Sequence, residues 1–261
     1  MEKFARRIYT KEIVTRFASG VHERAEHEFH RDHELFYLFE GEATIFSDKG
    51  KINITDGTLA VIPKGCYHGI ARADESKPFL RCTCHFDKLV GYDELINKKL
   101  TRVAFASSPE IALAFNGIRN VFERKRNEED TEGLMRSFVG LTIASLVPSD
   151  DNRQDGSLIL DRTVMEAVKY IDGHIGGDLS IETIAAHLHV SPSYLSCLFK
   201  KNMLIPIHKY ILNKRLILAN KKILSSTPSV SAAMECGFSD YSNFYVQYKK
   251  RFGISPSQSK N

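Results

Sequence analysis

Gly237-Phe238-Ser239-Asp240-Tyr241-Ser242-Asn243-Phe244 is the stretch that decides the fold of the C-terminal part of the chain. Gly237 predicts a tight turn, because a positive φ costs glycine little. Ser239 is of the residue type that caps a helix, and the following helix is expected to bury the side that carries Phe244, Tyr248 and Phe252. The preceding helix is expected to pack through Val230, Ala233 and Met234. Two helices joined by such a turn form a helix-turn-helix.

A second copy of this pattern lies upstream at a constant offset in the sequence, which indicates a repeated structural unit. The matched positions are Ser180-Ile181 with Ser229-Val230, Ser193 with Ser242, Leu195 with Phe244, Phe199 with Tyr248, and Lys200-Lys201 with Lys249-Lys250. In the upstream copy, Ser180 is expected to cap a helix that ends at a turn, and Ser191 to cap the helix that follows. Residues 207–224 are predicted to form a helix that connects the two copies.

The second helix of each copy has one face that is available for contacts outside the domain. On the first such helix this face carries Ser193, Ser196, Cys197 and Lys200, and on the second it carries Tyr241, Ser242, Asn243 and Val246. A helix with a narrow polar face fits the major groove of DNA, and two such helices on one rigid body could enter successive grooves about 34 Å apart. The candidate phosphate contacts are Lys200, Lys201, Lys249, Lys250 and Arg251. Basic residues at helix ends also complement the helix dipole, which is the alternative interpretation.

Residues 179–256 resemble the AraC/XylS family of bacterial transcription regulators, over about a third of the chain. The matching segments are 179–185, 190–195, 198–201, Tyr210-Ile211, Arg215-Leu216, Ala219, 237–244 and 248–256. The resemblance implies a regulator that binds specific sequences in double-stranded DNA. It also adds RNA polymerase to the candidate partners.

The sequence departs from the family pattern at several positions. Leu204 stands where the family usually has glycine, so the turn after the first recognition helix is expected to differ, and Ala233-Met234 replaces a usual Ile-Ala pair. Cys197 and Val246 stand where members often have arginine or another polar residue. A bidentate arginine–guanine contact supplies roughly 1–3 kcal/mol of discrimination, so we expect modest base discrimination. It would then depend more on DNA shape and on Ser193, Ser196, Ser242 and Asn243.

Charge is divided unevenly along the chain. Residues 1–160 carry 23 Lys and Arg against 25 Asp and Glu, a net of −2, whereas residues 161–261 carry 13 against 7, a net of +6. A basic segment joined to a slightly acidic one is typical of a polyanion-binding domain attached to a second domain. No apolar run approaches the length of a membrane-spanning helix, and the N-terminus has no apolar core of signal-peptide length. We therefore expect a cytoplasmic protein that does not contact membranes.

The N-terminal part is predicted to be a β-sandwich or small barrel, because turn residues separate many short strands. The predicted strands are 35–39, 44–46, 51–54, 58–62 and 79–86. Cys82 and Cys84 are expected to share one face of the last strand. The five cysteines include no CxxC pair, which argues against a disulfide framework and against a structural zinc site that would include His85.

Two helical stripes follow the predicted barrel. The first stripe contains Ile111, Ala114, Phe115, Ile118 and Phe122, and the second contains Leu134, Phe138, Leu141 and Ser145. Two adjacent apolar stripes with a short polar connection indicate an antiparallel helix pair. Two interpretations stay open: either the pair only covers the barrel, or one of its outer faces is also a homodimer contact.

Residues 28–41 and 56–68 resemble the two motifs of the cupin family. In metal-dependent cupins, histidines and a glutamate converge inside the barrel, but Glu28 stands here where a first histidine is usual. On a continuous strand, Glu28, His30 and Glu34 would share one face, with His68 on a neighbouring strand. His33 has the opposite parity, is expected to point outward and is given no role. The candidate effector-binding residues are His30, Glu34, Tyr37 and His68.

Several functions of the barrel remain open from the sequence. His30, Glu34 and His68 form a two-histidine, one-carboxylate set, which can hold Fe(II) in a cupin enzyme with an accessory DNA-binding domain. The barrel could instead serve only dimerisation, or bind a protein partner. We expect a pocket for a small effector with no metal, cofactor or catalytic residue, because the first histidine is missing and a DNA domain is attached. In the resembling regulators the barrel binds a sugar or another small metabolite, and the helix pair often dimerises.

These features together predict an α+β chain, with a cupin-like β-barrel, then a helix pair, then an all-α domain that contains two helix-turn-helix units. The expected parts are an effector-sensing barrel at 1–104, a helix pair for dimerisation at 105–147, a linker at 148–157 and a DNA-binding domain at 158–261.

Overall fold

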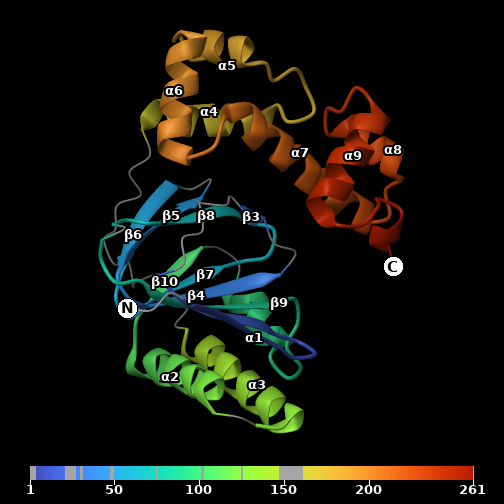
Figure 1. The fold of residues 1–261 in the computed structure, drawn as a ribbon. Coiled ribbons are helices and arrows are strands. Elements are labelled where there is room, and N and C mark those ends of the chain that lie inside the picture. Colours follow the sequence, from blue (N-terminus) through green and yellow to red (C-terminus); the bar gives the residue numbers. More distant parts are fainter. Residues whose placement is uncertain are drawn as a thin grey trace. The chain divides into compact units, whose positions relative to one another are not determined.

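The computed structural model describes residues 4–20, 28–29, 32–47, 50–74, 76–100, 103–124, 126–146 and 161–260. These residues form two compact units, one built from β1–β10 with α1–α3 and the other from α4–α9 (Figure 1). The predicted order of a β-rich part, a helix pair and an all-helical part is therefore confirmed. The predicted linker at 148–157 lies outside the described residues.

The strands of the N-terminal unit form two sheets. Within each sheet, every described pair of neighbouring strands is antiparallel. The larger sheet has, in spatial order, β1 (Phe4–Tyr9), β2 (Val14–Ser19), β9 (Leu80–Phe86), β4 (His33–Glu40), β7 (Thr58–Ile62) and β10 (Ala104–Ala106). The smaller sheet has β3 (Glu28–Phe29), β8 (Tyr67–Arg72), β5 (Glu42–Ser47) and β6 (Gly50–Thr55). The predicted strands are confirmed within a few residues, whereas β1, β2, β3, β8 and β10 are additional to the prediction.

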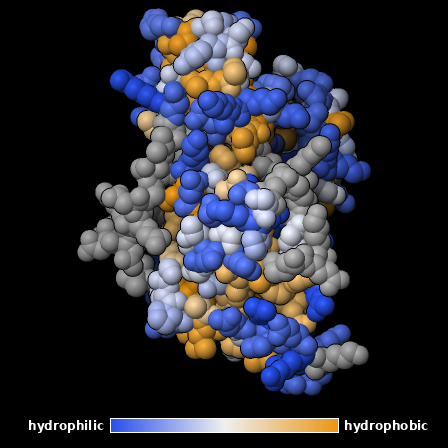
Figure 2. Space-filling model, turned by 60° about the vertical axis from the view of Figure 1, so that its left-hand side comes forward, coloured by the Kyte–Doolittle hydropathy of each residue, from blue (hydrophilic) through white to orange (hydrophobic). Residues whose placement is uncertain are grey.

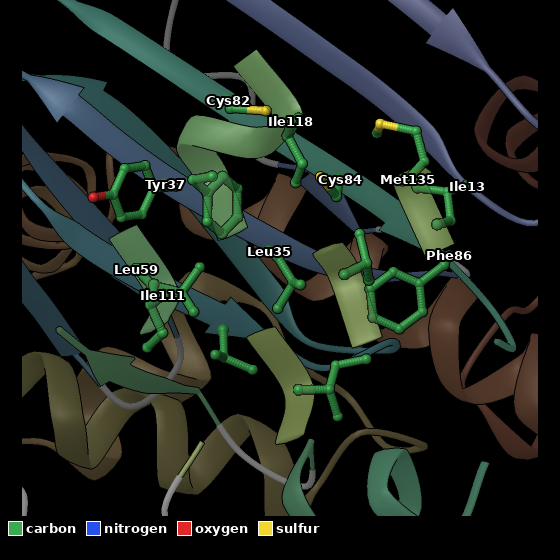
Figure 3. Close-up of a cluster of buried hydrophobic side chains, with 14 of the residues drawn as sticks. Ile13, Leu35, Tyr37, Leu59, Cys82, Cys84, Phe86, Ile111, Ile118 and Met135 are labelled. Atoms are coloured by element: carbon green, nitrogen blue, oxygen red, sulfur yellow. The ribbon is translucent and has the colours of Figure 1, made fainter. Parts of the chain in front are cut away.

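The central strands β4, β7 and β9 of the larger sheet are buried on both faces, which explains why β4 and β7 read as nearly continuous apolar runs. On β4, Leu35 and Tyr37 face one way and pack with α2 and α3 residues such as Phe115 (Figure 3). Phe36 and Leu38 face the other way and pack with residues of the smaller sheet. Successive residues of one strand therefore belong to two different cores, because strand side chains alternate between faces.

Three helices cover the outer face of the larger sheet: α1 (Asp93–Lys99), α2 (Pro109–Glu123) and α3 (Glu128–Ser145) (Figure 1). The interpretation that the helix pair covers the barrel is thus confirmed. The first predicted stripe is confirmed on α2, where Ile111, Phe115 and Ile118 are buried. The second predicted stripe, on α3, is wrong by about one position. Its residues Leu134, Phe138 and Leu141 are only half-buried. The residues that α3 buries include Met135, Val139 and Ile143.

Within the described residues, the C-terminal unit contains six α-helices and a short 3-10 helix at Gln258–Lys260. The α-helices are α4 (Arg162–Gly173), α5 (Ile181–His187), α6 (Pro192–Met203), α7 (Ile207–Leu224), α8 (Ser229–Glu235) and α9 (Tyr241–Phe252). The connecting helix α7 has the predicted bounds. The starts of α6 and α9 are separated by the same offset as their ends, and this offset is the one that relates the two sequence copies. The repeat seen in the sequence is therefore a repeat of structure.

The caps of α6 and α9 repeat at the same offset. Ser191 and Asp240 are the N-caps, and Leu204 and Gly253 are C-caps in the left-handed conformation, with φ of 54° and 73°. The prediction that Ser239 caps the second recognition helix is therefore wrong. The turns that precede these helices contain His189 and Gly237, and both residues have positive φ. These two residues are separated by one position less in the sequence than the two N-cap residues are. The second copy thus has one extra residue between its turn and its cap.

Helix α8 buries different residues from those predicted. Ala232 and Ala233 are buried, whereas Val230 and Met234 are half exposed, so the predicted packing of these two residues is wrong. Cys236 completes the buried side, one turn after Ala232. The first helix of each copy is short, and small alanines on its inner side let the neighbouring helix approach closely.

Hydrophilic residues cover much of the face of the molecule seen in Figure 2, and hydrophobic residues reach that surface in separate patches. None of the helices that the structure describes combines the length and the apolar character needed to cross a membrane.

The left-handed conformation of Leu204 generates a stability prediction. A side chain with a Cβ pays roughly 1–2 kcal/mol in this conformation, and part of that cost is offset in glycine by its freer unfolded chain. We expect the Leu204→Gly variant to be more stable than Leu204→Ala by about 1 kcal/mol, measured by denaturant unfolding of the C-terminal transition. Alanine is the matched control because it also removes the half-exposed side chain but keeps Cβ. Equal stability of the two variants would contradict the strain.

Candidate nucleic-acid interface and barrel site

The exposed face of α6 contains all the residues predicted for it. The hydroxyl of Ser191 accepts a hydrogen bond from the amide N–H of Tyr194 at 3.2 Å, and Pro192 follows at the first helical position. Leu195 and Phe199 are buried, which fixes the rotation of the helix. Ser193, Ser196, Cys197, Lys200 and Lys201 are all exposed as a result. They form one strip along the helix, because residues three and four apart are neighbours on a helix surface.

The exposed face of α9 contains most of the residues predicted for it. The carboxylate of Asp240 accepts hydrogen bonds from the amide N–H groups of Ser242 at 3.0 Å and Asn243 at 2.9 Å. Phe244 and Tyr248 are fully buried, and the hydroxyl of Tyr248 donates to Asn220 Oδ1. The exposed predicted residues are Ser242, Asn243, Val246, Lys249 and Lys250.

Two residues predicted for the α9 face are held partly inside the domain. Tyr241 is half-buried, its hydroxyl shares a hydrogen bond of 2.9 Å with Ser229 Oγ, and its ring packs on Phe244. Arg251 is also half-buried. Neither side chain belongs to the exposed strip that the other residues form.

Two exposed tyrosines were not among the predicted contacts. Tyr194 on α6 has 51% of its surface exposed, and Tyr245 on α9 has 38%. The repeat contains the signal that could have found them, since Tyr194 is the counterpart of Asn243 and Tyr245 is the counterpart of Ser196. Both counterparts were predicted contacts, so a strict transfer across the repeat would have added both tyrosines.

The barrel joins Glu34 and His68 in a buried pair. Glu34 lies on β4 of the larger sheet and His68 on β8 of the smaller one, and both are almost fully buried. Glu34 Oε2 is 2.9 Å from His68 Nε2, and His68 Nδ1 is 3.2 Å from the carbonyl oxygen of Cys66. Each ring nitrogen faces an acceptor.

The assumption of one continuous strand from Glu28 to Glu34 is wrong. Glu28 lies on β3 and pairs with His68 in the smaller sheet, whereas Glu34 lies on β4 in the larger sheet. Even numbering therefore does not place the two residues on one strand. The predicted residue His30 lies outside the described residues.

The structure does not bring Tyr37 to the Glu34–His68 pair. Tyr37 lies on the opposite face of β4 from Glu34, because an odd number of positions separates them, and its ring stacks on Phe115 of α2 at 4.4 Å (Figure 3). Burial raises the pKa of its phenol above the ordinary value. Tyr37 thus belongs to the core beneath the helices.

His33 lies on the opposite face of β4 from Glu34, as its parity predicts, but it is buried and not exposed to solvent. Its Nδ1 accepts a hydrogen bond of 3.2 Å from the amide N–H of Lys64, and its ring stacks on Phe86. Burial, followed by the positive charge of Lys64, lowers the pKa of His33 from 6.5 to about 4. The side chain is therefore a neutral acceptor at neutral pH.

Cys82 and Cys84 lie on the same face of β9, as predicted, in the core beneath the helices. Burial raises the pKa of the Cys82 thiol well above its ordinary value. His85 is the next residue and so faces the other side of the strand. Among the residues that the structure describes, no three histidine, cysteine, aspartate or glutamate side chains are grouped so as to hold a metal ion.

Two segments of the chain match known protein families. Residues 184–261 match the family described as "Helix-turn-helix domain", and residues 14–83 match the family described as "Cupin domain". The first match contains the exposed strips of α6 and α9, and the second contains Glu34 and His68.

Similar proteins include two bacterial regulators. The arabinose operon regulatory protein of Escherichia coli (strain K12) is 34% identical over 240 residues, which cover 86% of this chain and 78% of that protein. The regulatory protein PocR of Salmonella typhimurium is 33% identical over 97 residues, which cover 37% of this chain and 32% of PocR. The match thus spans about a third of the length of PocR. The crystal structure of unsaturated fatty acid bound ToxT from Vibrio cholerae shares 12% identity, with a TM-score of 0.40 over 97% of this chain and 96% of that one.

The Glu34–His68 contact generates a prediction about stability. We expect Glu34→Gln and His68→Gln to be non-additive with a coupling of about 1–3 kcal/mol, because each side chain satisfies the other in a buried place. The measurement is a double-mutant cycle from denaturant unfolding of the N-terminal transition. The corresponding cycle for Lys64 and Asp87, an exposed ion pair of 2.7 Å, is the control. Additive losses at Glu34 and His68 would show that the two side chains do not stabilise each other.

The low pKa of His33 generates a prediction about pH. The unfolded chain takes up a proton near pH 6.5, whereas the folded chain takes it up only near pH 4. The contribution of neutral His33 to the free energy of unfolding is therefore fully present above pH 6.5. The free energy of unfolding decreases by up to about 3 kcal/mol as the pH falls from 6.5 to 4. Unfolding measured across this range should show a weaker pH dependence in His33→Gln, which keeps an acceptor but does not titrate. An unchanged dependence would place the titration elsewhere.

Proposed function

The chain belongs to the AraC family of transcription regulators, and on that basis we propose that α6 and α9 bind duplex DNA while a small molecule in the barrel controls this binding. The observation that carries the proposal is the structural repeat. Two helices with the same length and equivalent caps each bury an aromatic side and expose a strip that ends in two lysines. Such a pair matches the way recognition helices enter successive major grooves.

The proposed base contacts are the exposed residues near the start of each helix. Ser193, Ser196 and Cys197 would read bases from α6, and Ser242, Asn243 and Val246 from α9. Lys200, Lys201, Lys249 and Lys250 would contact phosphates, which fix the position of the protein but carry no sequence information. Tyr241 and Arg251 are left out of the proposed contact set because both side chains are half-buried in the domain. Tyr194 and Tyr245 join the proposed set, because both are exposed on the same two helices.

We propose modest base discrimination for this chain. Cys197 and Val246 occupy equivalent exposed positions in the two copies of the repeat, and neither can donate two hydrogen bonds to a guanine. Serine and asparagine contacts, together with the shape of the duplex, would then supply the specificity.

The proposed effector site is formed by the buried pair of Glu34 and His68 in the barrel, together with His30. A small barrel can hold one ligand of metabolite size. A neutral ligand with hydroxyl groups could replace the contact between the two side chains with contacts to both. A relative is named for the arabinose operon, so a sugar is the first class of molecule to test. Tyr37 is not part of this proposal.

The other features of the proposal concern organisation. The barrel would occupy 1–104, the helix pair 105–147, the linker 148–157 and the DNA-binding domain 158–261. The outer face of α2 and α3 would serve homodimer formation, RNA polymerase would be a further partner, and the protein would act in the cytoplasm. We propose that it is not an enzyme. A metal held by His30, Glu34 and His68 would have to displace the hydrogen bond that Glu34 and His68 already make.

The test of the DNA-binding proposal is the affinity of the full chain for random-sequence duplex DNA across a salt series, followed by selection of a preferred site. We expect binding that falls steeply with salt, since each phosphate contact releases counterions. A selected site that exceeds random duplex by several orders of magnitude at physiological salt would contradict the modest discrimination. No binding at low salt would contradict the function itself.

The lysines at the ends of the recognition helices generate a quantitative prediction. Lys249→Ala should weaken binding to all sequences about equally and reduce the slope of log affinity against log salt by about 1. Lys169→Ala is the matched control, because Lys169 is an exposed lysine of the same unit that lies on α4 and not on a recognition helix. An unchanged slope in Lys249→Ala would remove that lysine from the interface.

The effector proposal is tested by thermal unfolding of the full chain in the presence of single sugars. A ligand at 100 times its Kd stabilises the folded state by about 2.7 kcal/mol, and this gain should disappear in Glu34→Gln and His68→Gln. A gain that both variants retain would place the effector elsewhere. A chelator-sensitive gain, or stoichiometric iron in the purified protein, would instead favour the metal-dependent cupin.

A further inference from the structure

Arg215 connects three separate backbone positions of the C-terminal unit. It lies on α7, and its guanidinium is partly buried. Nε donates to the carbonyl oxygen of Ile175 at 3.0 Å, Nη2 to that of Gly177 at 2.6 Å, and Nη1 to that of Gly237 at 2.9 Å. Ile175 and Gly177 lie in the loop that leads into the first helix-turn-helix. Gly237 forms the turn inside the second.

The two loops also touch each other directly. A Cβ on Gly176 would lie 2.5 Å from the carbonyl oxygen of Glu235, so the first loop fits against the second turn only without a side chain. A Cβ on Gly237 would lie 2.8 Å from the guanidinium of Arg215. We call the group formed by Arg215, residues 175–177 and residues 235–237 the joint.

The joint supplies a constraint that a single connecting helix cannot supply alone. Helix α7 has 18 residues and separates the two helix-turn-helix units along one axis, but each unit could still swing at the end of that axis. The hydrogen bonds of Arg215 connect the two units at a second place, apart from the ends of α7, and so restrict this rotation. Arginine suits the task because its planar group donates in several directions at once, whereas lysine offers one compact ammonium.

We propose that Arg215 is a positioning residue that fixes the angle between α6 and α9 and thereby the spacing of the two DNA segments that the protein can bind together. The proposal rests on the proposed function of α6 and α9. It concerns a group that does not touch DNA itself, since its donors are directed at the backbone of the domain.

The first test measures the geometry without DNA, so that it does not depend on the DNA-binding function. Spin labels are attached to Cys197 and to Val246→Cys, which are equivalent exposed positions on α6 and α9, in a chain that also carries Cys66→Ser. The remaining cysteines, Cys82, Cys84 and Cys236, are buried. Pulsed electron resonance should give one narrow distance distribution in this background and a broader or shifted one after Arg215→Gln. Arg215→Lys should give an intermediate width.

Two matched controls separate positioning from folding. Arg162→Gln removes an exposed arginine of the same unit, whose partner is Glu166 on the same helix, and should leave the distribution unchanged. Gly176→Ala should broaden the distribution, whereas Gly177→Ala should not, because its Cβ would meet only the carbonyl oxygen of His174 at 3.4 Å. Far-ultraviolet circular dichroism checks that the helices remain. The glycine pair keeps the proposal testable even if Arg215→Gln does not fold.

The second test uses two random-sequence duplexes, one of about one helical turn and one of about two, so that only the longer offers two successive major grooves. Two linked binding elements gain on the order of 10²-fold from each other when both can reach DNA. Arg215→Gln should therefore lose about tenfold or more in affinity for the longer duplex and little for the shorter one. An unchanged distance distribution in both Arg215→Gln and Gly176→Ala would overturn the proposal. Equal losses on both duplexes would also overturn it, because a purely structural defect weakens each element alike.

Discussion

The N-terminal unit depends on one constraint, the burial of the central strands β4, β7 and β9 of the larger sheet on both of their faces. Each of these strands contributes buried side chains to two sets, one on each face of the sheet. Leu35 and Tyr37 on β4 pack against α2 and α3, while Phe36 and Leu38 on the same strand pack against residues of the smaller sheet. Loss of either set exposes an entire core. This explains why buried residues dominate β4, β7 and β9.

The same constraint connects the effector candidates with the helix pair. Glu34 and Leu35 are successive residues on β4, but the first contacts His68 in the barrel and the second packs in the core beneath the helices. A close-packed core transmits a shift of a strand and does not absorb it. A ligand that changes the Glu34–His68 contact therefore acts on a strand that α2 and α3 also contact. Its effect is limited to the difference between its affinities for the two arrangements.

Local sequence rules predicted the C-terminal unit better than the barrel site. The bounds of α7 and the equivalence of α6 and α9 follow from apolar periodicity and from the repeat. Ser239 was mistaken for a cap because the second copy has one extra residue before Asp240, and a residue type alone does not reveal an insertion. Tyr37 could have been excluded from the site by parity with Glu34. The position of Glu28 could not be predicted, because it depends on the chain passing from one sheet to the other between β3 and β4. The burial of His33 could not be predicted either, because it depends on contacts with Phe86 and Lys64, which are distant in the sequence. The joint around Arg215 likewise depends on loops that only the folded unit brings together.

The two recognition helices share lengths and caps but not exposed side chains. Ser196 and Cys197 on one correspond to Tyr245 and Val246 on the other. Because the exposed side chains differ, different residues would contact the two halves of a bound DNA site. One chain would then lie on the duplex in a single direction, and the two flanks of its site would not be interchangeable. The direction in which the protein lies on DNA would thus be set by a single chain and would not require a second copy.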